Sequence, residues 1–155
     1  MQLTRFSDLG LRVLMYLNQH DRPLPVTIAE IATQFGVPHN HLVKVVNRLG
    51  KLGWIATQRG RNGGLRLACA PDELRLGEVL QALEGSTELI DCGEPPCVLR
   101  RHCLLKHALD AGLAAFYREM DTYTLADICA ERTGHTIAVL HRRYLKVLEQ
   151  DSKPA

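Results

Sequence analysis

Two short amphipathic patterns separated by a tight turn constrain the fold of this chain most. Thr27 and Glu30 have the spacing of a capping box, and apolar residues then recur at three- and four-residue intervals until Gly36. Pro38 suits the first position of a second helix, whose apolar residues recur as far as Gly53. Two short helices joined by a tight, glycine-containing turn form a helix-turn-helix.

A glycine-rich hairpin pattern follows the helix pair. Residues 54–58 and 65–68 are strand-like, and the RGRNGG segment between them contains an Asn-Gly pair typical of hairpin turns. Before the pair, residues 4–18 have the periodicity of another amphipathic helix. This order of elements predicts a winged helix-turn-helix.

The second helix of the pair has an exposed polar face suited to DNA. Its side chains combine hydrogen-bond donors and acceptors for base edges with positive charges for phosphates. The residues expected to bind DNA are His39, Asn40, His41, Lys44, Asn47 and Arg48 on this helix, and Arg59 and Arg61 at the hairpin tip. Each feature alone could be an ordinary solvated surface, and the net charge of +2 says little. Their order along the chain favours DNA binding.

Three cysteines lie close together further along the chain. Cys92, Cys97 and Cys103 follow a predicted helix that ends at Gly85, and glycine and proline residues separate the first two. The N-terminus lacks the features of a secretory signal, so we expect a cytoplasmic protein in a reducing environment. There, clustered cysteines favour metal binding or redox chemistry over disulfides. No apolar stretch is long enough to cross a membrane.

A long apolar stripe follows the cysteines. It consists of Leu105, Leu109, Leu113, Phe116 and Met120. Such a stripe is too long for a small domain to cover, so we expect it to pair with a second copy of the chain, although an intramolecular core is the alternative. A homodimer would read a palindromic site with half-sites roughly 34 Å apart. The predicted fold is mainly α with a small β-hairpin wing: a winged helix-turn-helix plus a long dimerisation helix.

Several segments together resemble the NsrR group of regulators: QLTRFSDLGLRVL, PHNHLVKVVNRLGKLGWI, QRGRNGGLRLA, DTYTLADI and the spacing of Cys92, Cys97 and Cys103. This group is the nitric-oxide-sensing branch of a bacterial family of winged-helix regulators that includes the iron–sulfur regulator IscR. The resemblance implies an iron–sulfur cluster in each cysteine loop, 4Fe–4S or alternatively 2Fe–2S. It further implies a repressor that binds operator DNA as a homodimer while the cluster is intact and releases it on nitrosylation.

The resemblance also implies a fourth cluster ligand. In NsrR-like proteins, an aspartate on the first helix of the partner subunit can complete the three thiolates, and the matching residue is Asp8. Arg12 lies one turn later and would act as a switch, because it can pair with Asp8 and compete for it. A solvated carboxylate near a helix N-terminus is the alternative for Asp8. His102 and His107 are rival ligands, as in IscR-like proteins, and rank below Asp8.

The chain divides into four predicted parts. These are a winged helix-turn-helix DNA-binding domain (1–84), a cluster-binding loop (85–103), dimerisation helices (104–134) and a C-terminal helix and tail (135–155). Within the third part, Thr124 is expected to begin a helix that closes at Gly134. Cys69 and Cys129 are expected to be small apolar fillers.

Other functions are weighed against this one. An IscR-like regulator of iron–sulfur or redox status, and a zinc-stabilised winged-helix regulator without sensing, both remain alternatives. An enzyme is disfavoured, because the sequence has no nucleotide-binding glycine motif and no recognisable nucleophile–base pair.

Overall fold

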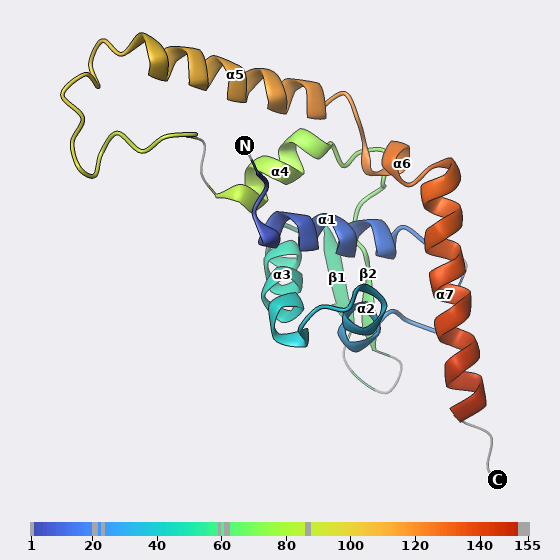
Figure 1. The fold of residues 1–155 in the computed structure, drawn as a ribbon. Helices are drawn as coiled ribbons and strands as arrows, with labels where there is room; N and C mark the ends of the chain where they lie inside the picture. Colours follow the sequence, from blue (N-terminus) through green and yellow to red (C-terminus); the bar gives the residue numbers. More distant parts are fainter. Residues whose placement is uncertain are drawn as a thin grey trace.

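The computed structural model describes residues 2–19, 22, 24–58, 60, 63–85 and 88–151, which form a small helical head and an extended arm (Figure 1). The head contains α1 (Arg5–Leu17), α2 (Ile28–Phe35), α3 (His39–Lys51), β1 (Ile55–Gln58), β2 (Gly64–Leu67) and α4 (Leu76–Glu84). The arm contains α5 (Leu104–Met120), α6 (Leu125–Ile128) and α7 (Glu131–Asp151). The predicted mainly α fold with a β-hairpin wing is confirmed. None of the described helices is long and apolar enough to span a membrane.

Local signals begin and end the helices of the head. The Thr4 hydroxyl accepts a hydrogen bond from the Ser7 N–H at the start of α1, and the Thr27 hydroxyl accepts one from the Glu30 N–H at the start of α2. Gly36 then ends α2 with a φ of 61°, a left-handed conformation that glycine adopts without steric cost. This turn brings α3 against α1 and α2.

The wing is an antiparallel hairpin joined to the rest of the head. Ile55 pairs with Leu67 and Gln58 with Gly64, and the Leu65 N–H donates to the carbonyl of Val26 at 2.7 Å. This additional bridge attaches the wing to the segment that precedes α2. The orientation of the wing is therefore coupled to that of the helix-turn-helix.

The helix α4 connects the head to the arm, because it packs against both α1 and α5. A Cβ atom on Gly77 would lie 2.4 Å from the carbonyl oxygen of Tyr117, so only glycine allows this approach of α4 to α5. Tyr117 and Leu113 are buried, whereas Leu105 is 64% exposed. The predicted stripe therefore packs within the chain at its C-terminal end and is exposed near the cysteine loop.

The predicted helix boundary at Gly134 is wrong. The short helix α6 ends at Ile128, and α7 continues through Gly134. A Cβ atom at position 134 would lie 2.3 Å from the carbonyl oxygen of Cys129. The glycine is therefore explained by close packing against the preceding turn and not by helix termination.

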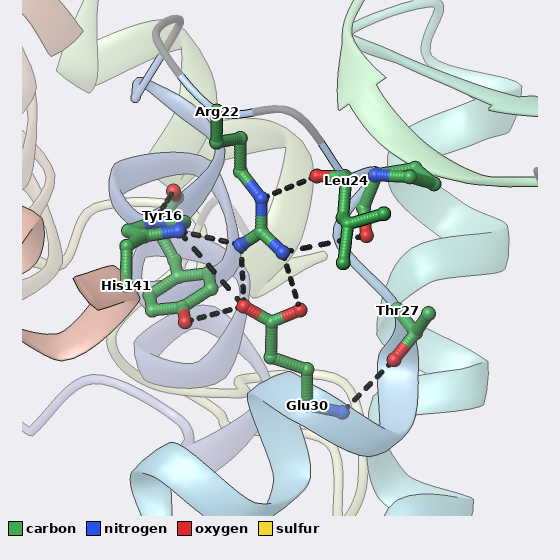
Figure 2. Close-up of polar contacts among 7 residues, drawn as sticks. Tyr16, Arg22, Leu24, Thr27, Glu30 and His141 are labelled. Carbon is green, nitrogen blue, oxygen red and sulfur yellow. Dashed lines mark hydrogen bonds and ion pairs between the residues drawn. The ribbon is translucent and has the colours of Figure 1, made fainter. Parts of the chain in front are cut away.

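The predicted capping box at Thr27 is only half formed, because the side chain of Glu30 points into the interior (Figure 2). Its carboxylate is 1% exposed and accepts hydrogen bonds from Arg22 Nη2 at 3.1 Å and from the Tyr16 hydroxyl at 2.7 Å. Arg22 also lies 2.6 Å from Nδ1 of His141, which comes from α7. The network therefore joins α1, α2 and α7 in the core.

The hydrogen bonds define the neutral form of His141. Nε2 lies 2.9 Å from the carbonyl oxygen of Tyr16, which can only accept, so Nε2 carries the proton. Nδ1 then accepts from Arg22, and the imidazole ring stacks on the Tyr16 ring at 3.9 Å. Burial lowers the pKa of His141, as does the Arg22 cation, whereas the bond to Tyr16 and the Glu30 carboxylate oppose this shift.

Protonation of His141 should destabilise the fold. Because its pKa is lowered on folding, the unfolded chain binds the proton more readily, and the stabilisation present above about pH 6.5 is lost as the pH falls below that value. We expect the free energy of unfolding, measured with urea, to decrease between about pH 7.5 and about pH 5.5. In His141→Phe the decrease should be smaller, and at the higher pH the loss of hydrogen bonds should cost about 1–3 kcal/mol. The exposed His135 provides the control: a His135→Phe variant that behaves like His141→Phe would contradict the prediction.

Candidate DNA interface and metal centre

The recognition helix α3 has one buried and one exposed face. Leu42, Val45, Val46 and Leu49 are buried in the core of the head. The opposite face presents the predicted DNA-binding residues, all exposed: His39, Asn40, His41, Lys44, Asn47 and Arg48. Of the hairpin residues predicted to join them, Arg59 and Arg61 lie outside the described residues. The helix thus presents donors, acceptors and positive charge on one face, as major-groove recognition requires.

Arg48 has a second role that the sequence does not reveal. Its Nη2 donates to the carbonyl oxygen of Ala82 at 3.0 Å. Ala82 lies in the last turn of α4, where helix carbonyls lack partners within the helix. Arg48 therefore joins the recognition helix to the end of α4, from which the cysteine loop leaves the head.

The cysteine loop carries three free thiols between α4 and α5. Cys92 is buried, Cys97 is exposed, and the Cys97 N–H donates to the Cys92 carbonyl at 3.2 Å. Desolvation raises the pKa of the Cys92 thiol, and so do the nearby Cys97 and, to a lesser extent, Cys103, whereas Lys106 opposes this. The three sulfurs thus lie near enough to influence one another electrostatically.

Cys103 caps α5. The sequence places it in the first turn of a long helix, and the structure places it one position earlier, where its sulfur accepts a hydrogen bond from the Lys106 N–H at 3.4 Å. Lys106 itself forms ion pairs with Glu88 at 3.3 Å and Asp110 at 3.0 Å. A thiolate at this position is favoured by the free N–H groups and by the dipole of α5.

The donor set fits an iron–sulfur cluster in chemistry but is incomplete within one chain. Three soft sulfur donors on one loop suit iron, and the usual complement is four. In the part of the chain that the structure describes, no three His, Cys, Asp or Glu side chains converge in a metal-binding arrangement. The cysteine loop extends away from the head, whereas α1, which carries Asp8, lies within the head (Figure 1).

The other candidate ligands are accessible. Asp8 forms an ion pair with Arg12 at 2.9 Å, and the two side chains are 45% and 44% exposed. This is the pairing that the sequence predicts for residues one helical turn apart. His102 and His107 are also exposed, and the His107 N–H donates to the backbone carbonyl of Cys103 at 3.2 Å.

The two remaining cysteines lie elsewhere. Cys129 is buried, and burial raises its pKa to about 11, which keeps the thiol protonated at neutral pH. Cys69 is half-buried against the core of the head. Both positions agree with small apolar fillers.

A helix-turn-helix with a β-hairpin wing, an exposed recognition helix and an attached helical arm defines a regulator of the winged-helix class. The model of the Rrf2 family, described as an iron-dependent transcriptional regulator, matches residues 3–131. The chain therefore belongs to the Rrf2 family of transcriptional regulators, and it is not an enzyme.

Individual relatives agree with this assignment. The HTH-type transcriptional regulator NsrR of Geobacillus kaustophilus (strain HTA426) is 42% identical over 146 residues, which cover 92% of this chain and 99% of the relative. NsrR of Bacillus licheniformis is 44% identical over 131 residues, which cover 83% and 92%. The structure of T. potens IscR has a TM-score of 0.66 at 21% identity and covers 100% of this chain and 93% of that one, which shows a shared fold. The predicted resemblance to the NsrR group is confirmed.

Two substitutions on α3 should separate phosphate contacts from base contacts. Lys44→Ala should weaken binding to all duplexes alike and reduce the slope of log affinity against log salt by about one per protomer. Asn47→Ala should instead weaken binding to a duplex selected from a random-sequence library more than binding to mixed-sequence DNA. The difference in binding free energy between the two duplexes should fall by about 1–3 kcal/mol. Arg118→Ala, which removes an exposed cation from α5, serves as the control. Equal salt slopes for Lys44→Ala and wild type would exclude the phosphate contact.

Proposed function

We propose that this chain is a nitric-oxide-sensitive transcriptional repressor. It binds palindromic operator DNA as a homodimer while an iron–sulfur cluster is intact, and it releases the DNA when nitric oxide reacts with that cluster. The observation that carries the proposal is the cysteine loop itself: three thiols between the DNA-reading head and the arm, in a chain more than 40% identical to regulators named NsrR. A 4Fe–4S cluster suits the loop best, with 2Fe–2S as the alternative.

Exposed apolar side chains around the loop support the homodimer. Val98 is 96% exposed, Leu104 is 83% exposed, and Leu99 and Leu105 are each 64% exposed. A group of exposed apolar side chains of this kind indicates a site of contact with another protein surface. A second copy of the chain would bury them and would also bring its own α1 towards the loop.

In the proposed dimer, the thiolates of Cys92, Cys97 and Cys103 bind the cluster, and Asp8 of the partner subunit is the fourth ligand. Arg12 holds the Asp8 carboxylate whenever Asp8 is not a ligand, because the ion pair is already formed in this structure. When bound, the cluster supplies iron that reacts with nitric oxide. A carboxylate matches this iron less well than thiolates do, so the Asp8 position is the most labile.

The proposed ligation by Asp8 across the two subunits has a direct effect on DNA binding. Asp8 lies on α1 of one head, and the thiols lie on the arm of the other subunit, so the fourth ligand would determine how the two heads are oriented. Loss of this ligand would change the separation of the two α3 helices, on which recognition of a palindrome depends. A hundredfold loss of operator affinity corresponds to about 2.7 kcal/mol, within the usual range for coupled sites.

The proposal predicts that nitric oxide removes operator binding. Protein purified without oxygen should be coloured and should bind a palindromic duplex selected from a random-sequence library, and titration with nitric oxide should lower its affinity about a hundredfold in a gel-shift assay. Cys97→Ser should lose the cluster and the response, whereas Cys69→Ser, outside the loop, should keep both. Equal affinity before and after nitric oxide would refute the proposal. A colourless, zinc-containing protein that binds DNA would support a structural metal site instead.

Substitution of Asp8 tests the fourth ligand separately. Asp8→Ala should leave the dimer intact, as measured by sedimentation, but should change the visible spectrum or shorten the lifetime of the cluster. Asp72→Ala, which removes an exposed carboxylate from a turn in the head, should leave the spectrum unchanged. An Asp8→Ala spectrum identical to that of wild type would remove Asp8 from the ligand set.

A further inference from the structure

The C-terminal helix α7 takes no part in the proposed sensing function and lies almost entirely beyond the residues that the family model matches. It is nevertheless fastened to the head. His141 is 3% exposed, and its ring nitrogens contact Tyr16 and Arg22 at 2.9 Å and 2.6 Å (Figure 2). The helix also contacts α2, the first helix of the helix-turn-helix.

This anchoring determines which side of α7 faces solvent. Because successive residues are rotated by about 100° around a helix, the positions one, two and five residues after His141 point away from the side of α7 that faces the head. Arg142, Arg143 and Lys146 are all exposed on this outer side. Among the residues whose side chains the structure describes, none forms an ion pair with these three cations. Their charges are thus available to an anionic partner.

The position of α7 beside the helix-turn-helix favours DNA as that partner. In a helix-turn-helix bound to DNA, the first helix crosses the sugar-phosphate backbone and the second enters the major groove. In Figure 1, α7 runs beside the head on the side of α2, and its C-terminal end points towards the end of the molecule that holds the α2–α3 turn and the N-terminus of α3. A duplex read by α3 would therefore extend towards the C-terminal half of α7.

We propose that Arg142, Arg143 and Lys146 form a second phosphate-binding face, which contacts the DNA backbone beside the half-site read by α3. These long side chains reach outward from the helix axis, and they bring positive charge and hydrogen-bond donors to phosphate oxygens rather than to base edges. The contact is therefore independent of sequence and adds affinity rather than specificity. This inference rests on DNA binding by the chain, but not on the cluster or on nitric oxide.

The test compares two variants that remove the same charge. Arg142→Ala/Lys146→Ala removes two cations from the C-terminal half of α7. Arg118→Ala/Arg132→Ala removes two exposed cations from α5 and from the opposite end of α7, the latter about 15 Å from Arg142 at 1.5 Å per residue. Binding to a mixed-sequence duplex of roughly 40 base pairs, about four helical turns, is measured by fluorescence anisotropy over a series of salt concentrations.

For the Arg142→Ala/Lys146→Ala variant, we expect the slope of log affinity against log salt to decrease by about two for each protomer bound. For the control variant, the slope should change by less than half as much. On a duplex that carries the palindrome selected from a random-sequence library, hydroxyl-radical footprints should be shorter at their outer edges only in the first variant. Thermal unfolding of both variants should match wild type, because all four side chains are exposed.

Three results would overturn the inference. A wild-type slope in Arg142→Ala/Lys146→Ala would leave DNA binding intact and exclude the α7 contact. Equal changes in the two variants would show that only total charge matters. A wild-type protein that binds no DNA under any salt condition would overturn the α7 contact together with the proposed function.

Discussion

A buried charge organises the DNA-reading head. The Glu30 carboxylate is 1% exposed, and removal of its partners would leave an unpaired ion in the interior at a cost of about 3–5 kcal/mol. Two of those partners bond to Glu30 directly: Tyr16 from α1 and Arg22 from the segment before α2. His141 from α7 contacts Arg22 and so joins the same network. Because all must be present together, α1, α2 and α7 behave as one unit. The placement of α3 against α2 depends on that unit.

Local rules explain the part of the fold that can be predicted from the sequence. Thr4 and Thr27 cap helices, Gly36 and Gly85 end them in left-handed conformations, and three- and four-residue periodicity separates the buried face of α3 from its exposed face. Each of these features depends on neighbours a few residues away. The helix-turn-helix, the wing and the candidate recognition residues therefore follow from short segments.

Long-range partners explain what could not be predicted. Glu30 has the spacing of a capping residue, yet it serves a network whose Arg22–His141 contact spans 119 positions. Arg48 belongs to the polar stripe of α3, yet it bonds to a carbonyl 34 positions away. Glycine commonly ends helices, yet the glycine at position 134 is required because a Cβ atom there would clash with the carbonyl oxygen of Cys129. The proposed ligand Asp8 is harder still, because its role needs a second chain.

The path of the chain has a mechanical consequence. It leaves the head at the end of α4, passes through the cysteine loop and α5, and returns through α6 to α7, which is anchored in the core of the head. The arm is therefore attached to the head at both of its ends, and not at one end only. A displacement at the thiols would therefore act on two contacts at once: the bond from Arg48 of α3 to Ala82 of α4, and the contact of His141 with Arg22, which pairs with Glu30 of α2. The two helices of the helix-turn-helix, α2 and α3, would thus be strained from opposite ends of the arm.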